Sequence, residues 1–303
     1  MIHAVIDVGS NSIRMSVYQC ENGSISPMID KKETVGLAGY IEDGVLTEEG
    51  MYRAADTIGA FIRVLHKFGI QNISVFATAS LRNAVNQEEA VRFIEERTGF
   101  KVAVISGEEE ARLDFIGATQ FLSVKDGVLV DIGGGSTEVV LFADGQISNL
   151  TSIPMGSLNM YTKFSSGVTL QNDERKLMRQ EILNNLSTLY WAPAEPVQTL
   201  VGVGGTARAF KKICHELYKV PRDVQRLDAG YLGMLVKIFK KGDVNLCRKI
   251  YKIAPERMLT IQPGLTILNE LAKRFGVSEV VVSRYGVREG YLIERVLKNG
   301  GDN

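Results

Sequence analysis

A repeated segment constrains the fold of this chain more than any other feature. Residues 5–12, Val-Ile-Asp-Val-Gly-Ser-Asn-Ser, recur with conservative changes at residues 129–136 as Leu-Val-Asp-Ile-Gly-Gly-Gly-Ser. The similarity continues along the next stretch, and each copy then reaches an Asn-Gly or Asp-Gly pair, at 22–23 and 144–145, which is typical of hairpin turns. Each copy therefore predicts a strand, a turn of small residues, a second strand, a hairpin and a third strand.

Each copy ends its first strand in an aspartate, Asp7 or Asp131, just before a turn of glycines and small polar residues. Glycine permits a positive φ and a close approach of the backbone to a ligand. Successive backbone N–H groups, together with serine hydroxyls and an asparagine amide, can form a nest that binds an anion. We therefore predict two phosphate-binding turns. Their candidate residues are Gly9, Ser10, Asn11, Ser12, Gly133, Gly134, Gly135 and Ser136.

Composition limits the classes of protein to which the chain can belong. In 303 residues, 35 basic side chains balance 35 acidic ones, which argues against a general nucleic-acid or membrane-surface binder. An anion site must therefore be local. The three cysteines have no metal-type spacing, no apolar run is long enough to span a membrane, and the first residues lack the pattern of a signal peptide. We expect a cytoplasmic protein that binds neither nucleic acid nor membrane.

The rest of the chain alternates apolar strands with amphipathic helices, which predicts an α/β fold. A change of pattern near residues 123–127 predicts one domain over residues 1–123 and a second over 124–287. The C-terminal helix, about residues 288–303, is a segment that can pack back on the first domain. Two halves that each open with a phosphate-type turn predict a cleft between them.

Residues 106–111, Ser-Gly-Glu-Glu-Glu-Ala, lie between a predicted strand and a predicted helix. Ser106 and Glu109 fit a capping box, and acidic residues are favoured in a first helical turn, so a structural explanation exists for all three glutamates. One spare carboxylate at the end of a strand is nevertheless a candidate general base, because it needs only to reach a water molecule.

Arg14 and Glu138 occupy equivalent positions in the two copies. Arg14 can bind phosphate and Glu138 can hold Mg²⁺ or water, or the two can form a salt bridge or face solvent. Arg82 and Arg288 follow predicted strands and are candidate phosphate ligands or ordinary surface arginines. The Gly-rich segment 202–206, with Gly204 and Gly205, is a weak phosphate-binding signal on its own, and no haem, flavin or zinc pattern is present.

Taken in order, these motifs resemble the Ppx/GppA family (exopolyphosphatase and guanosine pentaphosphate phosphohydrolase) within the actin and sugar-kinase superfamily. The resemblance covers essentially the whole chain. It rests on the segments 7–14, 77–82, 106–111, 131–138, 202–206 and 287–290.

The resemblance implies two actin-like (ribonuclease-H-like) domains that hydrolyse a terminal phosphoanhydride of polyphosphate or pppGpp and release orthophosphate. It implies Mg²⁺ as cofactor, with Mn²⁺ as the alternative, and a homodimer. The family's catalytic glutamate, immediately before an alanine, maps onto Glu110. Asp131 and Glu138 map onto metal or water ligands, and Asp7 is placed with them as a metal ligand. Because longer members of the family carry a helical C-terminal extension, the chain resembles the short, two-domain form.

Two departures from the family pattern are Val287 and the segment Arg257-Met258-Leu259, and both can alter substrate contacts. We hypothesise that Glu110 deprotonates a water molecule for in-line attack on the end phosphate. The two turns and Mg²⁺ would stabilise the developing charge, and Arg14 and Arg82 would hold neighbouring phosphates.

Other functions remain open at this stage. One alternative is an ATP-dependent phosphotransferase of the sugar-kinase type, and another is a non-catalytic sensor of guanosine polyphosphate or nucleotide. The sequence does not separate polyphosphate from pppGpp. A long polyphosphate would need a basic track, for which the pairs 211–212 and 240–241 and Arg284 are candidates, although such pairs are commonly solvated.

Overall fold

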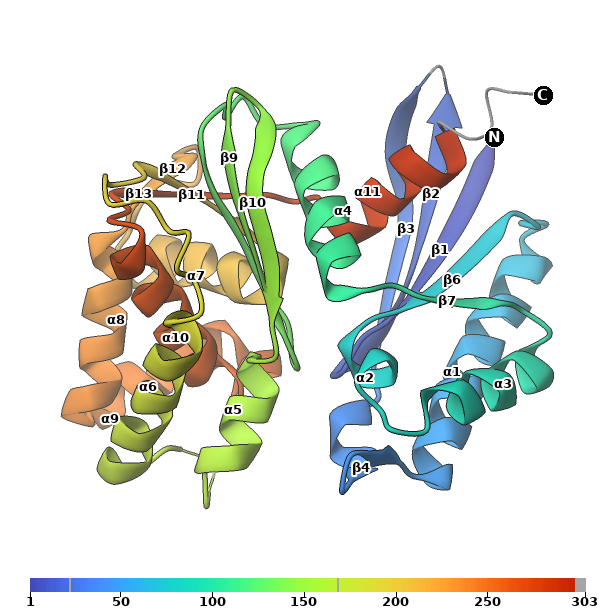
Figure 1. Ribbon diagram of the computed structural model, residues 1–303, viewed down its shortest axis with the longest axis horizontal. Helices are drawn as coiled ribbons and strands as arrows, with labels where there is room; N and C mark the ends of the chain where they lie inside the picture. The colour runs from blue at the N-terminus through green and yellow to red at the C-terminus, as the bar shows by residue number, and fades with distance from the viewer. Residues whose placement is uncertain (22, 168, 298–303) are drawn as a thin grey trace. The chain divides into compact units, whose positions relative to one another are not determined.

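The computed structural model describes residues 1–21, 23–167 and 169–297. It confirms the mixed α/β class and divides into two compact units (Figure 1). The first unit is Met1–Gly117 with the described part of Val287–Asn303, and the second is Ala118–Gly286. The sequence boundaries, at 123/124 and 287/288, lie close to these. The predicted cleft between the halves stays a prediction.

The first unit is built on a five-stranded sheet in which an antiparallel ribbon continues into parallel strands. The ribbon consists of β1, β2 and β3, and β6 and β7 follow as strands parallel to β1. Across the sheet the order is β3 (Ser24–Thr34), β2 (Ser12–Glu21), β1 (Ile2–Val8), β6 (Ile73–Ala77) and β7 (Val102–Val104).

One face of this sheet packs on α1 (Glu48–Lys67) and α3 (Gln87–Thr98). Helix α1 begins where the Thr47 hydroxyl accepts a hydrogen bond from the Gly50 amide, at 3.3 Å. Its apolar residues recur at helical spacing and are buried in the shared core, as the periodicity predicts. These buried residues are Met51, Ala54, Ala55, Ile58, Ile62 and Leu65. Short elements complete this side: η1 (Leu37–Tyr40), β4 (Ile41–Glu42), β5 (Val45–Leu46) and α2 (Ala79–Arg82).

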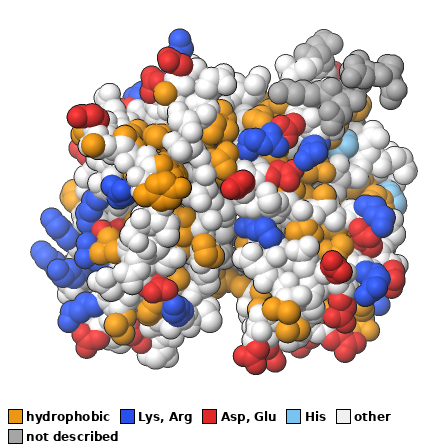
Figure 2. Space-filling view, in the orientation of Figure 1, with side chains coloured by type: hydrophobic (Ala, Val, Ile, Leu, Met, Phe, Trp, Pro, Cys, Tyr) orange, Lys and Arg blue, Asp and Glu red, His pale blue; other side chains and the backbone are white. Residues whose placement is uncertain are grey.

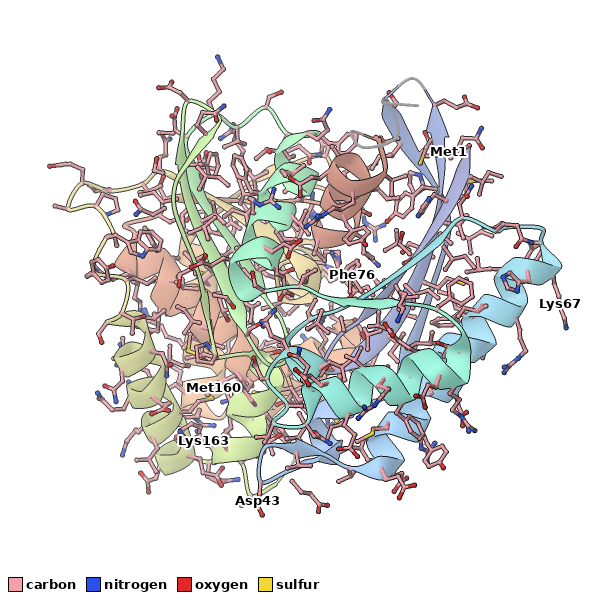
Figure 3. The ribbon with its side chains drawn as sticks, turned by 45° about the vertical axis from the view of Figure 1, so that its right-hand side comes forward. Met1, Asp43, Lys67, Phe76, Met160 and Lys163 are labelled. Atoms are coloured by element: carbon pink, nitrogen blue, oxygen red, sulfur yellow. The ribbon has the colours of Figure 1, made fainter. Side chains whose placement is uncertain are left out.

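The other face packs on α4 (Gly107–Thr119), α11 (Val287–Tyr291) and the π-helical turn η3 (Leu292–Leu297). Phe76 of β6, labelled in Figure 3, stacks on Tyr291 with ring centroids 5.0 Å apart. A Cβ on Gly290 would lie 1.9 Å from the Leu113 carbonyl oxygen, so α11 lies directly against α4. The segment after residue 286 thus returns to the first unit and completes its core.

The second unit repeats the plan of the first with six strands. Its ribbon consists of β8, β9 and β10, β11 and β13 are parallel to β8, and β12 is antiparallel to β13. The order is β10 (Gln146–Ile153), β9 (Thr137–Ala143), β8 (Gly127–Ile132), β11 (Thr199–Val203), β13 (Glu279–Val282) and β12 (Arg226–Asp228).

The helices of the second unit share one large core with a single face of its sheet, the face of Val128, Val130 and Ile132. Helix α10 is buried on almost all sides, since twelve of its fourteen residues are buried. The helices are α5 (Ser157–Phe164), α6 (Asn172–Leu186), α7 (Gly204–Leu217), α8 (Gly230–Lys241), α9 (Val244–Ile253), the short η2 (Pro255–Arg257) and α10 (Ile261–Arg274). Within the described residues, no helix has the length and apolar character that crossing a bilayer requires.

The predicted repeat is confirmed at the level of strand register. Both ribbons carry a bulge at the equivalent place, between Val17 and Tyr18 in the first and opposite Leu141 and Phe142 in the second. The second hairpin turns at Asp144 and Gly145, which both have positive φ, as the Asp-Gly pair predicts.

Candidate functional site

The turn after the first strand of each ribbon has the same backbone structure. The amide of Gly9 donates to the Ser12 carbonyl at 3.1 Å, and the amide of Gly133 donates to the Ser136 carbonyl at 3.0 Å. A Cβ on Gly9 or Gly133 would lie 3.2 or 3.3 Å from that same carbonyl oxygen. Glycine is therefore needed for a close backbone approach.

Neither Gly9 nor Gly133 uses the positive φ that glycine permits. Among the described residues, the glycines with positive φ include Gly145 and Gly204 but neither of these two. The turns are tight because the chain folds back on its own carbonyl, and this requires no left-handed residue.

The second turn is held by the start of α5. The Ser157 amide donates to the Gly133 carbonyl and the Leu158 amide to the Gly134 carbonyl, both at 2.9 Å. A Cβ on Gly156 would lie 2.4 Å from the Gly134 carbonyl, so only glycine fits there. Since the C=O and N–H of a trans peptide point in opposite directions, carbonyls bound to α5 leave the following N–H groups directed away from it. These N–H groups are the candidate anion ligands of the second turn.

The first turn is held in a comparable way by Gly36 and the start of η1. The Gly36 amide donates to the Asn11 carbonyl and the Ala38 amide to the Ser10 carbonyl, each at 2.9 Å. The supporting segments come from different parts of the two units, but both fix the turn by binding its carbonyl oxygens. Ser10 and Ser136 are buried, whereas Asn11 and Ser12 are partly exposed.

Glu110 lies at the start of α4, and its carboxylate accepts a hydrogen bond from the guanidinium of Arg82 at 2.6 Å. Both side chains are largely buried, 12% and 15% exposed. The same Arg82 nitrogen lies 3.3 Å from the Ile105 carbonyl, where the strand before α4 ends. The structure thus brings together two predicted site residues that are far apart in the sequence, and a charge-assisted hydrogen bond orients the carboxylate.

The neighbouring glutamates have other environments. The Glu109 amide donates to the Ser106 hydroxyl at 3.1 Å, which confirms the predicted cap, but its carboxylate accepts from Arg295. Glu108 is exposed. Of the three glutamates, Glu110 alone is buried, and it is the one that the family resemblance singles out.

A second cluster in the first unit joins Arg14 and Arg288. Asp30 lies between them: one carboxylate oxygen is 3.5 Å from Nε of Arg14 and 3.4 Å from Nη1 of Arg288, which also donates to Ser16 at 3.1 Å. Asp7 pairs with Arg14 in the sheet register. Two adjacent guanidinium groups are side chains that can bind a phosphate through paired hydrogen bonds.

The pKa shifts show that these groups are electrostatically coupled. Burial and the nearby Arg288 lower the pKa of Arg14, while Asp30 and Asp7 act against this. Burial acts to lower the pKa of Arg288, but Glu289, Tyr18 and the two aspartates raise it above its ordinary value. Asp30 was not predicted from the sequence, because its position on the third strand becomes informative only with the register of β2 and β3.

In the second unit, Asp131 and Glu138 are direct partners across β8 and β9, so their side chains lie on the same face of the sheet. Glu138 is 1% exposed and accepts a hydrogen bond from Ser152 at 2.7 Å. The Asp131 carboxylate lies against Gly204, where a Cβ would be 2.1 Å from Oδ1 and where φ is +72°. Gly204 therefore leaves space for that carboxylate.

Two neighbouring carboxylates fit the way proteins hold Mg²⁺, which is commonly bound by one or two carboxylates together with substrate phosphates. The described residues contain no cluster of three or more His, Cys, Asp or Glu side chains arranged to hold a metal. Asp131 and Glu138 are the pair that would hold the ion, and Asp7 belongs to the first unit. The donor set is thus compatible with a metal shared between protein and substrate.

Arg257 is a site residue that the sequence reasoning noticed only as a departure from a motif. A Cβ on Gly205 would lie 1.3 Å from its Nη2 atom, so the guanidinium lies directly over the first turn of α7. Together, Gly204 and Gly205 make room for a carboxylate and a guanidinium. No local sequence signal links residues 205 and 257, which come together only through the packing of the second unit.

Comparison with known proteins agrees with this geometry. The model of the Ppx/GppA phosphatase family matches residues 16–299. A guanosine-5'-triphosphate,3'-diphosphate pyrophosphatase of Photobacterium profundum is 28% identical over 310 residues, 98% of this chain and 60% of that protein. The chain thus spans about three-fifths of the length of that relative.

A Haemophilus influenzae protein that carries an exopolyphosphatase name is 29% identical over 295 residues, 95% of this chain and 90% of that protein. The crystal structure of the Aquifex aeolicus Ppx/GppA family member has a TM-score of 0.80 at 26% identity and covers 99% of this chain and 98% of its own. Since the family model spans almost all residues and the fold agrees along the full length, this chain belongs to the Ppx/GppA phosphatase family.

Proposed function

We propose that the protein is a phosphoanhydride hydrolase that releases terminal orthophosphate from inorganic polyphosphate or from guanosine pentaphosphate. The observation that carries the proposal is the buried Glu110 carboxylate oriented by Arg82. Membership of the family and the names of its relatives support the same reaction. A cytoplasmic location and a homodimeric state belong to the same proposal.

In the proposed reaction, a water molecule donates a hydrogen bond to Glu110 and its oxygen attacks the terminal phosphorus. A new P–O bond forms, the bridging P–O bond opposite it breaks, the proton passes to Glu110, and the shortened phosphate chain takes the negative charge. The N–H groups of the turn at residues 9–12 and the Arg14–Arg288 pair, in the same unit as Glu110, hold phosphate oxygens through charge-assisted hydrogen bonds.

Mg²⁺ held by Asp131 and Glu138 would neutralise negative charge on the phosphates. The chain's own contribution there is to keep both carboxylates in place, Asp131 against Gly204 and Glu138 through the hydrogen bond from Ser152. A carboxylate with this support needs little reorganisation when it binds a cation.

The test measures phosphate release from polyphosphates of defined length and from pppGpp, with and without Mg²⁺, for the wild type and Glu110→Gln. Glutamine keeps the shape of the side chain but cannot accept the proton, so we expect kcat to fall by about 10²–10⁴-fold. Substrate binding should change little.

The matched control is Glu108→Gln on the same helical turn, which is exposed and should keep wild-type turnover. Near-normal turnover of Glu110→Gln would show that a residue other than Glu110 is the general base. Transfer of phosphate from ATP to a sugar, in place of free phosphate, would favour the kinase alternative, and binding without phosphate release would favour the sensor.

A further inference from the structure

A cavity of about 760 Å³ in the second unit is lined by an excess of positive charge. Its walls come from α7, from residues 222–225, from residues 282–285 after β13 and from residues 121–122. The lining cations are Arg208, Lys211, Lys212, Arg222 and Arg284, and Glu216 is the acid among the lining residues. Five cations less one carboxylate leave a local charge of +4 in a chain whose net charge is zero.

The acid of the cavity is already paired with one of its cations. Glu216 accepts a hydrogen bond from Arg222 at 3.0 Å. Lys211 lies 3.5 Å from the side-chain oxygen of Gln225, which is uncharged. Lys212 and Arg284 are both exposed. Charge of this density, focused in a concave surface, attracts a polyanion.

The cavity continues the candidate phosphate site along one side of α7. Gly205, Arg208, Lys212 and His215 follow each other at intervals of three or four residues, and Lys211 stands three residues after Arg208, so they lie on one side of that helix. At 1.5 Å per residue, Lys211 and Lys212 lie about 10 Å along the axis from the Gly205 turn. The basic side of α7 therefore leads from the Gly204–Gly205 turn into the cavity.

The aromatic residues of the cavity favour a phosphate chain over a nucleoside. The rings of Phe121 and Tyr285 pack on each other, with centroids 4.1 Å apart and an angle of 38° between their planes. Because each ring has the other as its partner, the pair forms a wall and leaves no slot for a base between the two rings. Cations on several elements match a ligand with repeated negative charge.

We propose that this cavity binds the body of an inorganic polyphosphate chain, beyond the phosphates at the Gly204–Gly205 turn, so that long polyphosphate is preferred over guanosine pentaphosphate. The proposal rests on the proposed function, because it assumes that the reacting end lies at the turns. The basic residues found in the sequence differ in their position relative to the cavity. Lys211, Lys212 and Arg284 line it, whereas Lys240 and Lys241 are the last residues of α8 and do not line it. Figure 2 shows basic side chains over α8 and α9, a solvated surface that serves as a control.

The test measures binding of a long polyphosphate of defined length, and of tripolyphosphate, to the full chain by calorimetry. The variant is Lys211→Gln/Lys212→Gln/Arg284→Gln. The matched control, Lys237→Gln/Lys240→Gln/Lys241→Gln, removes three exposed cations from α8. We expect the cavity variant to bind long polyphosphate about 30- to 100-fold more weakly, with a much smaller loss for tripolyphosphate and a shallower salt dependence. The α8 variant should bind like the wild type.

The proposal would be overturned if the cavity variant lost equal affinity for both chain lengths, or if the two variants lost equal affinity for long polyphosphate. It would also be overturned if the same three residues bound pppGpp more tightly than long polyphosphate. A single-stranded RNA that displaces the polyphosphate with equal affinity would also overturn it. The binding measurement does not depend on turnover. A wild type that releases no phosphate would therefore contradict the proposed function, while the calorimetry would still show whether the cavity binds polyphosphate. Lys212→Arg, which keeps the charge, should bind long polyphosphate like the wild type.

Discussion

The two ribbons of this protein share a backbone and differ in charge. At equivalent places of the sheet register, the first ribbon carries Asp7, Arg14 and Lys32, and the second carries Asp131, Glu138 and Ser152. The turn hydrogen bond, the glycine and the bulge are the same in both. Two cations in the first ribbon are thus replaced by an acid and a neutral residue in the second.

This difference separates what the fold requires from what the chemistry requires. Both ribbons need a glycine where the chain folds back on a carbonyl, and both turns need their carbonyls bound by a neighbouring segment. Only the side chains on the second and third strands set the charge. One ribbon is therefore suited to bind an anion, and the other to hold the cation that accompanies it.

Removing the charge of Glu138 should have the largest effect, because it makes the second ribbon uncharged at that position. In Glu138→Gln the side-chain oxygen can still accept from Ser152, but the anionic ligand is lost. We expect kcat/KM at limiting Mg²⁺ to fall by about 10²–10³-fold. Titration of phosphate release with Mg²⁺ measures this, and higher Mg²⁺ should restore part of the loss. A variant that keeps the wild-type Mg²⁺ response would remove Glu138 from the metal site.

Gly156→Ala tests the support of the second turn. The new Cβ would meet the Gly134 carbonyl at 2.4 Å, so α5 or the turn must move. We expect the free energy of unfolding to fall by about 1–3 kcal/mol and turnover to fall by roughly tenfold. Gly39→Ala, in the segment that supports the first turn, is the control, since nothing lies within 4 Å of its Cβ. Equal melting curves for the two variants would show that the turn tolerates the displacement.

Arg14→Gln tests the cationic ribbon. It removes one of the two guanidinium groups that share Asp30 and leaves Asp131 and Glu138, the proposed Mg²⁺ ligands, unchanged. We expect KM for the phosphate substrate to rise about tenfold, with a smaller change in kcat and no shift in the Mg²⁺ titration. A shift in the Mg²⁺ dependence would contradict the division of roles between the ribbons.

Tyr18→Phe should have the smallest effect, because the equivalent residue of the second ribbon is Phe142. Burial and Glu289 raise the pKa of Tyr18 above its ordinary value of 10.0. The neutral hydroxyl therefore stabilises the folded state at pH values below about 10, and this contribution is lost as the pH rises further. We expect Tyr18→Phe to lower the free energy of unfolding by about 1 kcal/mol at neutral pH. In denaturant titrations, the difference between variant and wild type should shrink above pH 10.

The sequence predicts most of the fold because its pattern is local. The sequence predicts strands over residues 73–77, 199–203 and 279–282, and the structure has β6, β11 and β13 there. It predicts helices over residues 47–68 and 204–217, and α1 and α7 lie within a residue of these bounds. Helices α3 and α5 were missed, and so was α9. Helix α3 is largely polar with only two buried residues, and α5 is eight residues long, so neither gives a clear apolar periodicity.

The candidate site was less predictable because its contacts are long-range. The motif identifies Glu110, but its partner Arg82 is 28 positions earlier and becomes adjacent only when β6 and β7 lie side by side. Asp30 depends on strand register, and Arg257 depends on the packing of η2 against α7. Sequence reasoning therefore found the residues with a local motif and missed those defined by their neighbours in space.

The return of residues 287–297 to the first unit has a consequence for biosynthesis. Arg288, Glu289 and Leu292 complete the sheet face that carries Arg14 and Tyr18, and the whole second unit is translated before them. During translation the ribosome therefore releases the second unit as a contiguous chain, while the part of this face that α4 does not cover stays exposed on the first unit. Apolar surface exposed in this way favours aggregation and chaperone binding until residues 287–297 have been synthesised and pack on it.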